Sequence, residues 1–319
     1  MKLPLLVVAG PTGVGKTAAV VALGARVPLE VVSADSRQVY RFMDAATGKP
    51  SAAERAAVAH HLVDVVNPDD RYQAARFRRD AIAAIAEIHQ HGRLPAVVGG
   101  TGLYIRALLR GLDPAPPANP ELRRELTAVA LRDGRGALHA RLAATAPAVA
   151  NRLHPNDQVR VIRALERLHG SAGVGALTSA APETGTWNTP SADTPFDVVY
   201  VGLTMARDAL NARLVARAAA MAKAGLAEEV EALLARGYDP ELPALQGIGY
   251  REFVRVVRGE MNAATALAAM QRETVRYAKR QGTWFAREPG IEWLEVTPSM
   301  DAADTAAIIE RRLQEGRLL

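Results

Sequence analysis

The sequence contains no cysteine among its 319 residues. This absence excludes a disulfide framework, a zinc site built on thiolates and a catalytic thiol nucleophile. The chain also lacks any uncharged apolar run approaching the roughly 18 residues that a membrane-spanning helix needs. We therefore expect a cytoplasmic protein that makes no membrane contact.

Lysine is scarce as well. The chain has 39 basic and 34 acidic residues, so its formal net charge is +5, and only five of the basic residues are lysines: Lys2, Lys16, Lys49, Lys223 and Lys279. A GC-rich genome would explain the excess of arginine and alanine. Phosphate recognition would explain the arginines too, because a guanidinium binds two oxygens at once. Composition alone leaves both explanations open.

Short apolar runs alternate with stretches of helical spacing. Strands are predicted at residues 5–9, 29–34, 94–98, 198–203 and 291–296. Helices are predicted at 17–25, 74–88, after 102, at 207–223, 226–236, 248–258 and 262–281, and from about 301. Strand, turn and helix in repetition indicate βαβ units and a mostly parallel sheet.

Residues 10–17 read GPTGVGKT and fit the pattern G-x-x-x-x-G-K-[ST] between a predicted strand and a predicted helix. The glycines let backbone N–H groups point inward, and the helix N-terminus adds partial positive charge. Lys16 would neutralise terminal phosphate oxygens, and the Thr17 hydroxyl is a ligand that suits Mg²⁺. The predicted polyphosphate site comprises Gly10, Pro11, Thr12, Gly13, Val14, Gly15, Lys16 and Thr17. The motif alone does not distinguish ATP from a diphosphate on another molecule.

The domain organisation follows from breaks in this pattern. Residues 113–120 are proline-rich, residues 121–169 read as helical and arginine-rich, and residues 170–195 have the composition of a flexible surface loop. We expect an α/β fold whose P-loop NTPase-like parallel-sheet core comprises residues 1–114 and 196–319. Residues 115–195 would form a helical insertion domain, and the C-terminal part would be helical.

Two further turns follow predicted strands. Asp35 ends the second strand and Thr101 lies in the Gly-Gly-Thr-Gly turn after the third. Ligands of open α/β sheets bind beyond the carboxyl ends of the strands, so Asp35 would face the phosphate site. Thr101 offers a hydroxyl there, but its glycine-rich turn is equally typical of an ordinary strand-to-helix turn. Asp35 suits a Mg²⁺ ligand, a general base or a simple turn aspartate. The neighbouring His60–His61 pair does not favour a metal site, because adjacent residues do not share one face.

The stretch 274–285 combines cationic and aromatic residues. Arg276, Lys279 and Arg280 lie at i, i+3 and i+4 and form one cationic helix face, with Tyr277, Trp284 and Phe285 interleaved. Such a face suits RNA, because charges bind phosphates and rings stack on unpaired bases. A solvated basic face with aromatic residues in the core is the alternative. Two arginine pairs have similar helical spacing, Arg160 with Arg163 and Arg213 with Arg217.

Together these stretches resemble the tRNA dimethylallyltransferases, also called tRNA isopentenyltransferases. The matching stretches run in order along nearly the whole chain: GPTGVGKT at 10–17, SADSRQVY at 33–40, HHLVDVVNP at 60–68, VVGGTGLYI at 97–105, DQVRVIRALE at 157–166, GIGYREF at 247–253 and YAKRQGTWF at 277–285. Two segments depart from the family pattern. Residues 45–50 read AATGKP instead of I-G-T-A-K-P, and 170–195 keep little of a usual G-x-P-x-S pattern.

The resemblance implies transfer of a dimethylallyl group from its diphosphate to N6 of the adenosine 3′ to the anticodon, tRNA position 37, with release of diphosphate. Mg²⁺ on Thr17 and the phosphate loop would stabilise the leaving group. The resemblance makes Asp35 the base that accepts the N6 proton, and Thr101 and Arg217 added diphosphate contacts, with Arg213 beside them.

The tRNA partner would be its anticodon stem-loop, held largely by the insertion. The expected tRNA-binding positions, including those of the basic helix, are Ser36, Arg37, Gln38, Thr101, Arg123, Gln158, Val159, Arg160, Val161, Ile162, Arg163, Arg276, Lys279 and Arg280. A monomer is expected, because one chain carries every motif. Three alternatives share the phosphate loop: an ATP-dependent small-molecule kinase, an adenylate isopentenyltransferase that acts on free nucleotide, and an RNA-binding protein that uses the loop as a switch.

Overall fold

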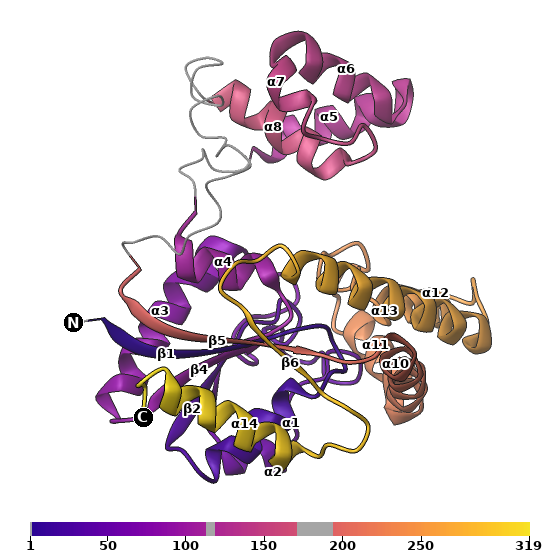
Figure 1. Cartoon of the computed structure of the whole chain (residues 1–319). Coiled ribbons are helices and arrows are strands. Elements are labelled where there is room, and N and C mark those ends of the chain that lie inside the picture. Colours follow the sequence, from indigo (N-terminus) through magenta and orange to yellow (C-terminus); the bar gives the residue numbers. More distant parts are fainter. Residues whose placement is uncertain (1, 113–118, 171–193) are drawn as a thin grey trace. The chain divides into compact units, whose positions relative to one another are not determined.

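The computed structural model describes residues 2–112, 119–170 and 194–319. The chain divides into two compact units (Figure 1), one formed by Met1–Gly111 with Thr189–Leu319 and the other by Leu112–Asn188. The predicted borders at 114/115 and 195/196 lie three and seven residues further along the chain than these. Most of the predicted loop at 170–195 and of the proline-rich stretch at 113–120 falls outside the described residues.

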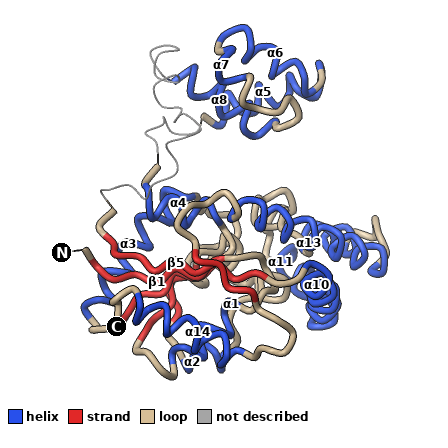
Figure 2. The backbone as a smooth tube through the Cα atoms, viewed as in Figure 1, coloured by secondary structure: helices blue, strands red, loops and turns tan. Residues whose placement is uncertain are grey.

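The first unit is built on a six-stranded sheet in the order β3-β2-β4-β1-β5-β6, and every pairing between neighbours is parallel. Figure 2 shows these strands between helices. The strands are β1 (Leu3–Ala9), β2 (Leu29–Ser33), β3 (His60–His61), β4 (Leu94–Gly99), β5 (Phe196–Thr204) and β6 (Glu292–Glu295). The parallel α/β sheet predicted from the apolar runs is confirmed. The two-residue β3 is too short to give such a run and was not predicted.

The helices of the first unit follow the predicted ones closely. They are α1 (Lys16–Gly24), α2 (Ala52–Ala57), α3 (Ala74–Gln90), α4 (Gly102–Arg110), α10 (Arg207–Met221), α11 (Ala227–Ala235), α12 (Tyr250–Val257), α13 (Ala263–Phe285) and α14 (Ala302–Glu315). A π-helical segment, η2 (Ala222–Leu226), joins α10 to α11, and Gly225 makes the bend with φ 97°. No helix within the described part of the chain is both long and apolar enough to cross a bilayer.

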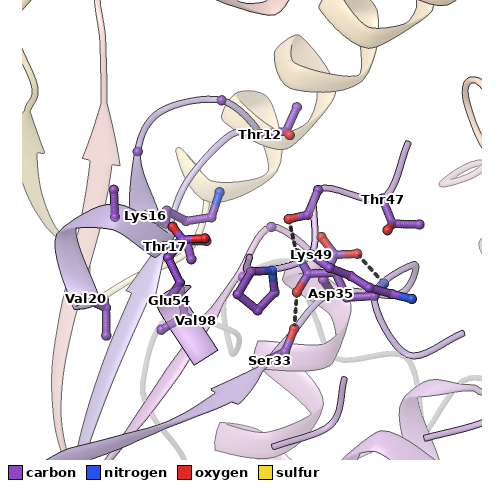
Figure 3. Close-up of a pocket in the computed structure, with 18 of the residues that line it drawn as sticks. Thr12, Lys16, Thr17, Val20, Ser33, Asp35, Thr47, Lys49, Glu54 and Val98 are labelled. Carbon is purple, nitrogen blue, oxygen red and sulfur yellow. Dashed lines mark hydrogen bonds between the residues drawn. The ribbon is translucent and has the colours of Figure 1, made fainter. Parts of the chain in front are cut away.

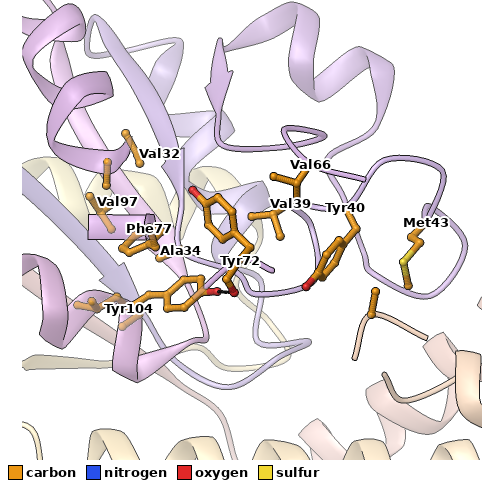
Figure 4. Packing of buried hydrophobic residues seen from close by; sticks show 14 of the residues in the cluster. Val32, Ala34, Val39, Tyr40, Met43, Val66, Tyr72, Phe77, Val97 and Tyr104 are labelled. Atoms are coloured by element: carbon orange, nitrogen blue, oxygen red, sulfur yellow. Dashed lines mark hydrogen bonds between the residues drawn. The ribbon is translucent and has the colours of Figure 1, made fainter. Parts of the chain in front are cut away.

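Alternation along β1 builds a core on each face of the sheet. Leu5, Val7 and Ala9 belong to one buried cluster, whereas Leu6 and Val8 belong to the other. In the first cluster the rings of Phe77 on α3 and Tyr104 on α4 stack at 4.4 Å (Figure 4). The second cluster receives side chains of α1 and α14. Burial on both faces explains why β1 reads as a continuous apolar run.

The second unit is all helical within its described residues. Its helices are α5 (Pro120–Asp133), α6 (Arg135–Thr145), α7 (Pro147–Ala150) and α8 (Gln158–Gly170). They enclose a separate small core that includes Leu126, Leu138, Leu142 and Val161. The prediction of helical structure across 121–169 is confirmed.

Parallel pairing brings the carboxyl ends of β1, β2 and β4 to one edge of the first unit. The backbone there is joined by hydrogen bonds from Ala34 N to Val98 O (2.8 Å) and from Thr101 N to Ala34 O (3.1 Å). The phosphate loop, the turn at Asp35 and the turn at Thr101 are therefore neighbours, although they are far apart in sequence.

Candidate active site

The phosphate loop runs from the end of β1 to the start of α1. Gly10, Gly13 and Gly15 have φ values of 142°, 80° and 106°, which side-chain-bearing residues rarely adopt. A Cβ on Gly10 would also overlap the carbonyl oxygen of Leu203. Lys16 Nζ donates hydrogen bonds to Gly10 O (2.9 Å) and Pro11 O (2.8 Å), so its ammonium lies over the curled loop (Figure 3).

The environment of Lys16 suits an anion. Burial lowers the pKa of its ammonium to about 8, the charge of Asp35 opposes this shift, and the charge of Arg217 adds to it. A diphosphate beside the ammonium would stabilise its charged form. The loop therefore holds a cation that gains from a bound phosphate.

Asp35 has the turn role that the sequence allowed, and it retains a second carboxylate oxygen outside that turn. Its Oδ1 accepts hydrogen bonds from the N–H groups of Arg37 (2.8 Å) and Gln38 (3.4 Å), so the residue shapes its own turn. Its Oδ2 accepts no hydrogen bond from the described residues. The same carboxylate lines two pockets, so one oxygen holds the turn and the other is available for chemistry.

Thr101 and Tyr277 flank this carboxylate. Thr101 Oγ1 accepts a hydrogen bond from Ser36 N (3.0 Å), which ties the Gly-Gly-Thr-Gly turn to the Asp35 turn. Burial and the charge of Asp35 raise the pKa of Tyr277 to about 12, while a hydrogen bond with Thr101 acts in the opposite direction. The Tyr277 hydroxyl therefore keeps its proton at neutral pH and can donate a hydrogen bond to an acceptor.

Two pockets meet at Asp35. The first, here called the phosphate pocket, has a volume of about 350 Å³ and is lined by residues that include Lys16, Thr17, Glu54, Arg213 and Gln281. The second, here called the arginine pocket, has a volume of about 270 Å³ and its lining includes Arg37, Arg251, Tyr277 and Arg280. Four residues line both pockets: Thr12, Asp35, Thr47 and Arg217. The two pockets therefore adjoin at one carboxylate and one guanidinium.

Arg217 is a partly buried cation at the junction of the two pockets. Within the described parts of the chain, its partly buried guanidinium makes no hydrogen bond and no ion pair. Burial lowers its pKa, and the charges of Asp35 and Glu54 oppose that shift. One turn earlier on α10, the exposed Arg213 Nη1 donates to Gly13 O (3.4 Å). The structure thus brings both arginines to the phosphate loop.

The donor set at the loop fits Mg²⁺ bound together with a diphosphate. Thr17 and Asp35 both line the phosphate pocket. No group of three or more His, Cys, Asp and Glu side chains among the described residues could hold a metal ion without a further ligand. Mg²⁺ commonly takes few protein ligands and completes its octahedron with phosphate oxygens and water. The predicted ligand Thr17 is therefore well placed, provided that the substrate supplies oxygens.

The expected tRNA-binding turn has extensive protein contacts. The Arg37 guanidinium donates to Pro243 O (2.7 Å) and Ala244 O (3.3 Å). The Gln38 side chain bonds Ser33 Oγ (2.8 Å) and Gly48 O (2.8 Å). Ser36 and Arg37 line the arginine pocket, and Gln38 lines the phosphate pocket. These residues therefore stabilise the walls of the two pockets through their protein contacts and also line those pockets.

The cationic residues of α13 separate into two sets. Arg280 lines the arginine pocket, and its guanidinium lies 5.7 Å from the centre of the Tyr277 ring. Arg276 and Lys279 line neither pocket. Arg276 is 68% exposed and donates to Glu273 Oε1 (2.6 Å). The basic face therefore includes one residue at the site and two on the surrounding surface.

The predicted tRNA-binding residues of the second unit differ in exposure. Val159 is 80% exposed, whereas Val161 is fully buried and Ile162 is 9% exposed. The side chains of Val161 and Ile162 pack into the core of this unit, so these two expected tRNA-binding positions present no side chain to RNA. Gln158 begins α8, and Arg160 lies on its exposed side.

Arg123 and Arg163 bind the buried carboxylate of Glu166. Arg123 Nε and Nη2 donate to its two oxygens (2.7 and 2.8 Å), and Arg163 Nη1 donates at 3.3 Å. Burial would raise the pKa of Glu166, but the hydrogen bonds from Arg123 and Arg163 hold it below its usual value. Arg123 thus has a structural role in addition to the expected contact with tRNA.

The divergent segment 45–50 forms part of the site wall. Thr47 and Gly48 line the phosphate pocket, and Gly48 has φ +62°. The Lys49 side chain is only 4% exposed, and its ammonium binds Asp44, Asp64 and the Tyr40 carbonyl. This segment therefore supports the pocket through its backbone and its own ion pairs.

Gln281, Tyr277 and Arg251 belong to the site but were not assigned to it from the sequence. Gln281 accepts from Thr12 N and donates to Gly100 O, and Tyr277 adjoins Asp35. Gln281 and Tyr277 both lie in the stretch YAKRQGTWF, one of those that resemble the family, so the resemblance could have identified them. From residue spacing alone, Tyr277 was only one of the aromatic residues interleaved with the cationic ones. Arg251 of GIGYREF also lines the arginine pocket.

Comparisons with known proteins agree with this geometry. Residues 38–288 match the family described as "IPP transferase", and residues 3–64 match "Isopentenyl transferase". The tRNA dimethylallyltransferase of Anaeromyxobacter dehalogenans is 47% identical over 97% of this chain and 99% of its own length.

Solved structures give the same result. The full-length tRNA isopentenylpyrophosphate transferase of Bacillus halodurans is 36% identical, with a TM-score of 0.71 over 99% of both chains. A eukaryotic dimethylallyltransferase acting on tRNA is 25% identical, with a TM-score of 0.80 over 99% of this chain and 79% of that one.

Proposed function

The chain belongs to the IPP transferase family, and from this premise we propose that it transfers a dimethylallyl group from dimethylallyl diphosphate to N6 of adenosine 37 of tRNA, releasing diphosphate. One observation carries the assignment of the site. The phosphate pocket and the arginine pocket share Asp35 and Arg217. A diphosphate donor bound in the first pocket and an RNA base entering the second would meet at these two residues.

The leaving group is the diphosphate. Breaking the bond between the allylic carbon and its oxygen places negative charge on that diphosphate. The phosphate-loop backbone, the Lys16 ammonium and Arg217 would stabilise this charge, because they line the phosphate pocket in which the diphosphate would lie. Mg²⁺ held by Thr17 would supply further charge neutralisation when bound.

The nucleophile is the exocyclic amine of adenine. Its N6 is weakly nucleophilic, so loss of a proton during attack helps the new carbon–nitrogen bond to form. Asp35 Oδ2 is the acceptor that suits this step, since Oδ1 is already engaged with the turn. The protonated Tyr277 hydroxyl and Thr101 lie beside this carboxylate and would help to orient the base.

The arginine pocket is the proposed entrance for RNA. Arg37, Arg251 and Arg280 line it, and Met221, Ile248 and Met270 add apolar surface. Cationic groups suit backbone phosphates, and apolar side chains suit the faces of an unstacked base. Adenosine 37 would have to leave its stack to reach Asp35. The helical second unit is the proposed holder of the anticodon stem.

The test is direct prenyl transfer. The protein is incubated with Mg²⁺, dimethylallyl diphosphate and an anticodon stem-loop that carries adenosine at position 37, and the RNA is weighed by mass spectrometry. A mass gain of one dimethylallyl group, absent from the same RNA with guanosine at that position, supports the proposal. ATP hydrolysis without RNA modification would support the kinase alternative. Prenylation of free adenylate alone would support the adenylate isopentenyltransferase.

The named relatives favour the tRNA enzyme over all three alternatives. The monomeric state and the cytoplasmic location stay predictions. Size-exclusion chromatography with light scattering would check the first of them.

A further inference from the structure

Gln281 occupies an unusual position between the phosphate loop and α13. Its Oε1 accepts a hydrogen bond from Thr12 N–H (2.9 Å), and its Nε2 donates to Gly100 O (2.9 Å). The residue is only 6% exposed. A single side chain on α13 is therefore bonded to two of the three turns that form the site.

The fit around this amide is tight. A Cβ on Gly100 would overlap Gln281 Nε2. The orientation of the amide is also fixed by its partners, because a backbone N–H needs the oxygen and a carbonyl needs the nitrogen. The hydrogen bonds thus set both the position of the side chain and the distance between α13 and the loop.

Gln281 shares a helix face with a residue of the other pocket. Tyr277 lies four residues earlier on α13, so the two side chains are neighbours on one face. Tyr277 and Arg280 line the arginine pocket, whereas Gln281 lines the phosphate pocket. A small shift of α13 caused by RNA would consequently reach Thr12 through this amide.

We propose that Gln281 is a positioning residue that holds the phosphate loop against α13 and so links RNA contact in the arginine pocket to diphosphate affinity in the phosphate pocket. The inference rests on the proposed function, because that function assigns RNA to the arginine pocket. Any coupling of this kind is reciprocal, so diphosphate would tighten RNA binding by the same factor.

The experiment measures binding of inorganic diphosphate by titration calorimetry in the presence of Mg²⁺, with and without an unmodified anticodon stem-loop. In the wild type, the stem-loop should lower the diphosphate Kd by about 5-fold or more. Gln281→Met should raise the Kd by about 5- to 30-fold, because two hydrogen bonds are lost. Its Kd should also be nearly the same with and without RNA.

Gln271→Met is the matched control. It makes the same substitution on the same helix, at a residue that lines neither pocket and whose amide donates to Val215 O (3.2 Å). This variant should bind diphosphate as the wild type does and keep the effect of RNA. The inference is overturned if Gln281→Met retains both the wild-type affinity and its dependence on RNA, or if RNA changes nothing in the wild type.

Two further measurements keep the inference testable if Gln281→Met fails to fold. Gln281→Asn retains an amide but is one methylene shorter, so it cannot reach Thr12 and Gly100 together and should also lose the coupling. In the wild type, stem-loop RNA should slow hydrogen exchange of the amides at residues 10–17. Unchanged exchange would contradict the link. Failure of the proposed function is distinct from both, since it would appear as absent prenyl transfer by the wild type.

Discussion

The guanidinium of Arg217 packs directly against the backbone of Gly48. A side chain at Gly48 would overlap Nη2 of Arg217, and Gly48 itself has φ +62°. Gly48→Ala should therefore displace Arg217 from the junction of the two pockets and raise the KM for dimethylallyl diphosphate by about 10-fold, the loss expected for one charge-assisted hydrogen bond. Steady-state kinetics at saturating RNA would measure this.

Gly92→Ala is the control for that substitution. Gly92 has a similar φ of +67°, but a Cβ there would have nothing within 4 Å. Both variants should lose about 1 kcal/mol of stability from backbone strain. Only Gly48→Ala should affect KM, and an equal effect of the two on KM would mean that Arg217 is not the cause.

Asp35 allows its two roles to be separated. Asp35→Asn keeps an Oδ1 acceptor for the turn N–H groups of Arg37 and Gln38, whereas Asp35→Ala loses it. Both variants should lower kcat by roughly two to four orders of magnitude if the carboxylate is the base. Only Asp35→Ala should also weaken RNA binding, through a looser turn. Near-normal turnover by Asp35→Asn would exclude the base role.

The pKa of Lys16 predicts a pH dependence of diphosphate binding. Burial lowers this pKa to about 8, so the ammonium is charged below pH 8 and loses its proton as the pH rises above it. Diphosphate affinity should therefore fall between about pH 8 and pH 9.5 in calorimetric titrations. Lys16→Arg stays charged over this range and should lack the step. An identical step in both proteins would assign it to the diphosphate itself.

The buried ammonium of Lys16 should also lower the free energy of unfolding at neutral pH. Its folded pKa of about 8 lies below the unfolded value of about 10.4, so the unfolded chain binds more protons between these pH values. Stability from this group therefore rises with pH across that window and is lowest below it. Lys16→Met should raise the melting temperature at pH 7 while greatly weakening diphosphate binding. A lower melting temperature would contradict the burial of the charge.

Arg280 and Arg276 should differ in their contributions to RNA binding. Arg280 lines the arginine pocket, whereas Arg276 pairs with Glu273 and lines neither pocket. Arg280→Met should weaken stem-loop binding and reduce the slope of log K against log salt by about one, as the loss of one phosphate contact requires. Arg276→Met should change the slope less. Equal slopes in the two variants would argue for a diffuse basic surface.

Arg123 should stabilise the fold of the second unit even when no RNA is bound. Arg123→Met leaves Glu166, whose side chain is 1% exposed, with the weaker pair to Arg163. Because Arg123 itself is 41% exposed, we expect a loss of about 1–3 kcal/mol of stability. The double variant Arg123→Met with Glu166→Met should recover much of this loss in denaturant titrations. Its RNA affinity would then report any direct contact between Arg123 and tRNA.

The sequence predicted the parts of the fold that depend on local patterns. Apolar runs located β1, β2, β4 and β5 to within two residues at each end, because their residues are buried on both faces. The short α2 was missed, although Ser51 and Glu54 form a capping box that marks a helix start. α13 ends at Phe285, four residues past the predicted 281, so Gly282 lies inside the helix and does not end it.

The site was predictable only in part, because some of its contacts join residues that are far apart in the sequence. The phosphate loop and the Asp35 turn are local motifs that follow strands, so parallel pairing places them together. The bond from Thr12 to Gln281 spans 269 residues, and the bond from Gln281 to Gly100 spans 181. Nothing in the neighbourhood of a lone glutamine indicates such partners. Likewise, the helical spacing of Val161 and Ile162 did not show which face of α8 is buried.

The two pockets open onto Asp35 with separate linings and share only four residues. Under the proposed function, each substrate would therefore have its own route to the Asp35 carboxylate, and neither would need to leave before the other arrives. For steady-state kinetics this means that reciprocal plots at different fixed RNA concentrations should intersect. Parallel lines would instead require a prenylated enzyme, for which a cysteine-free site of this kind supplies no thiol carrier.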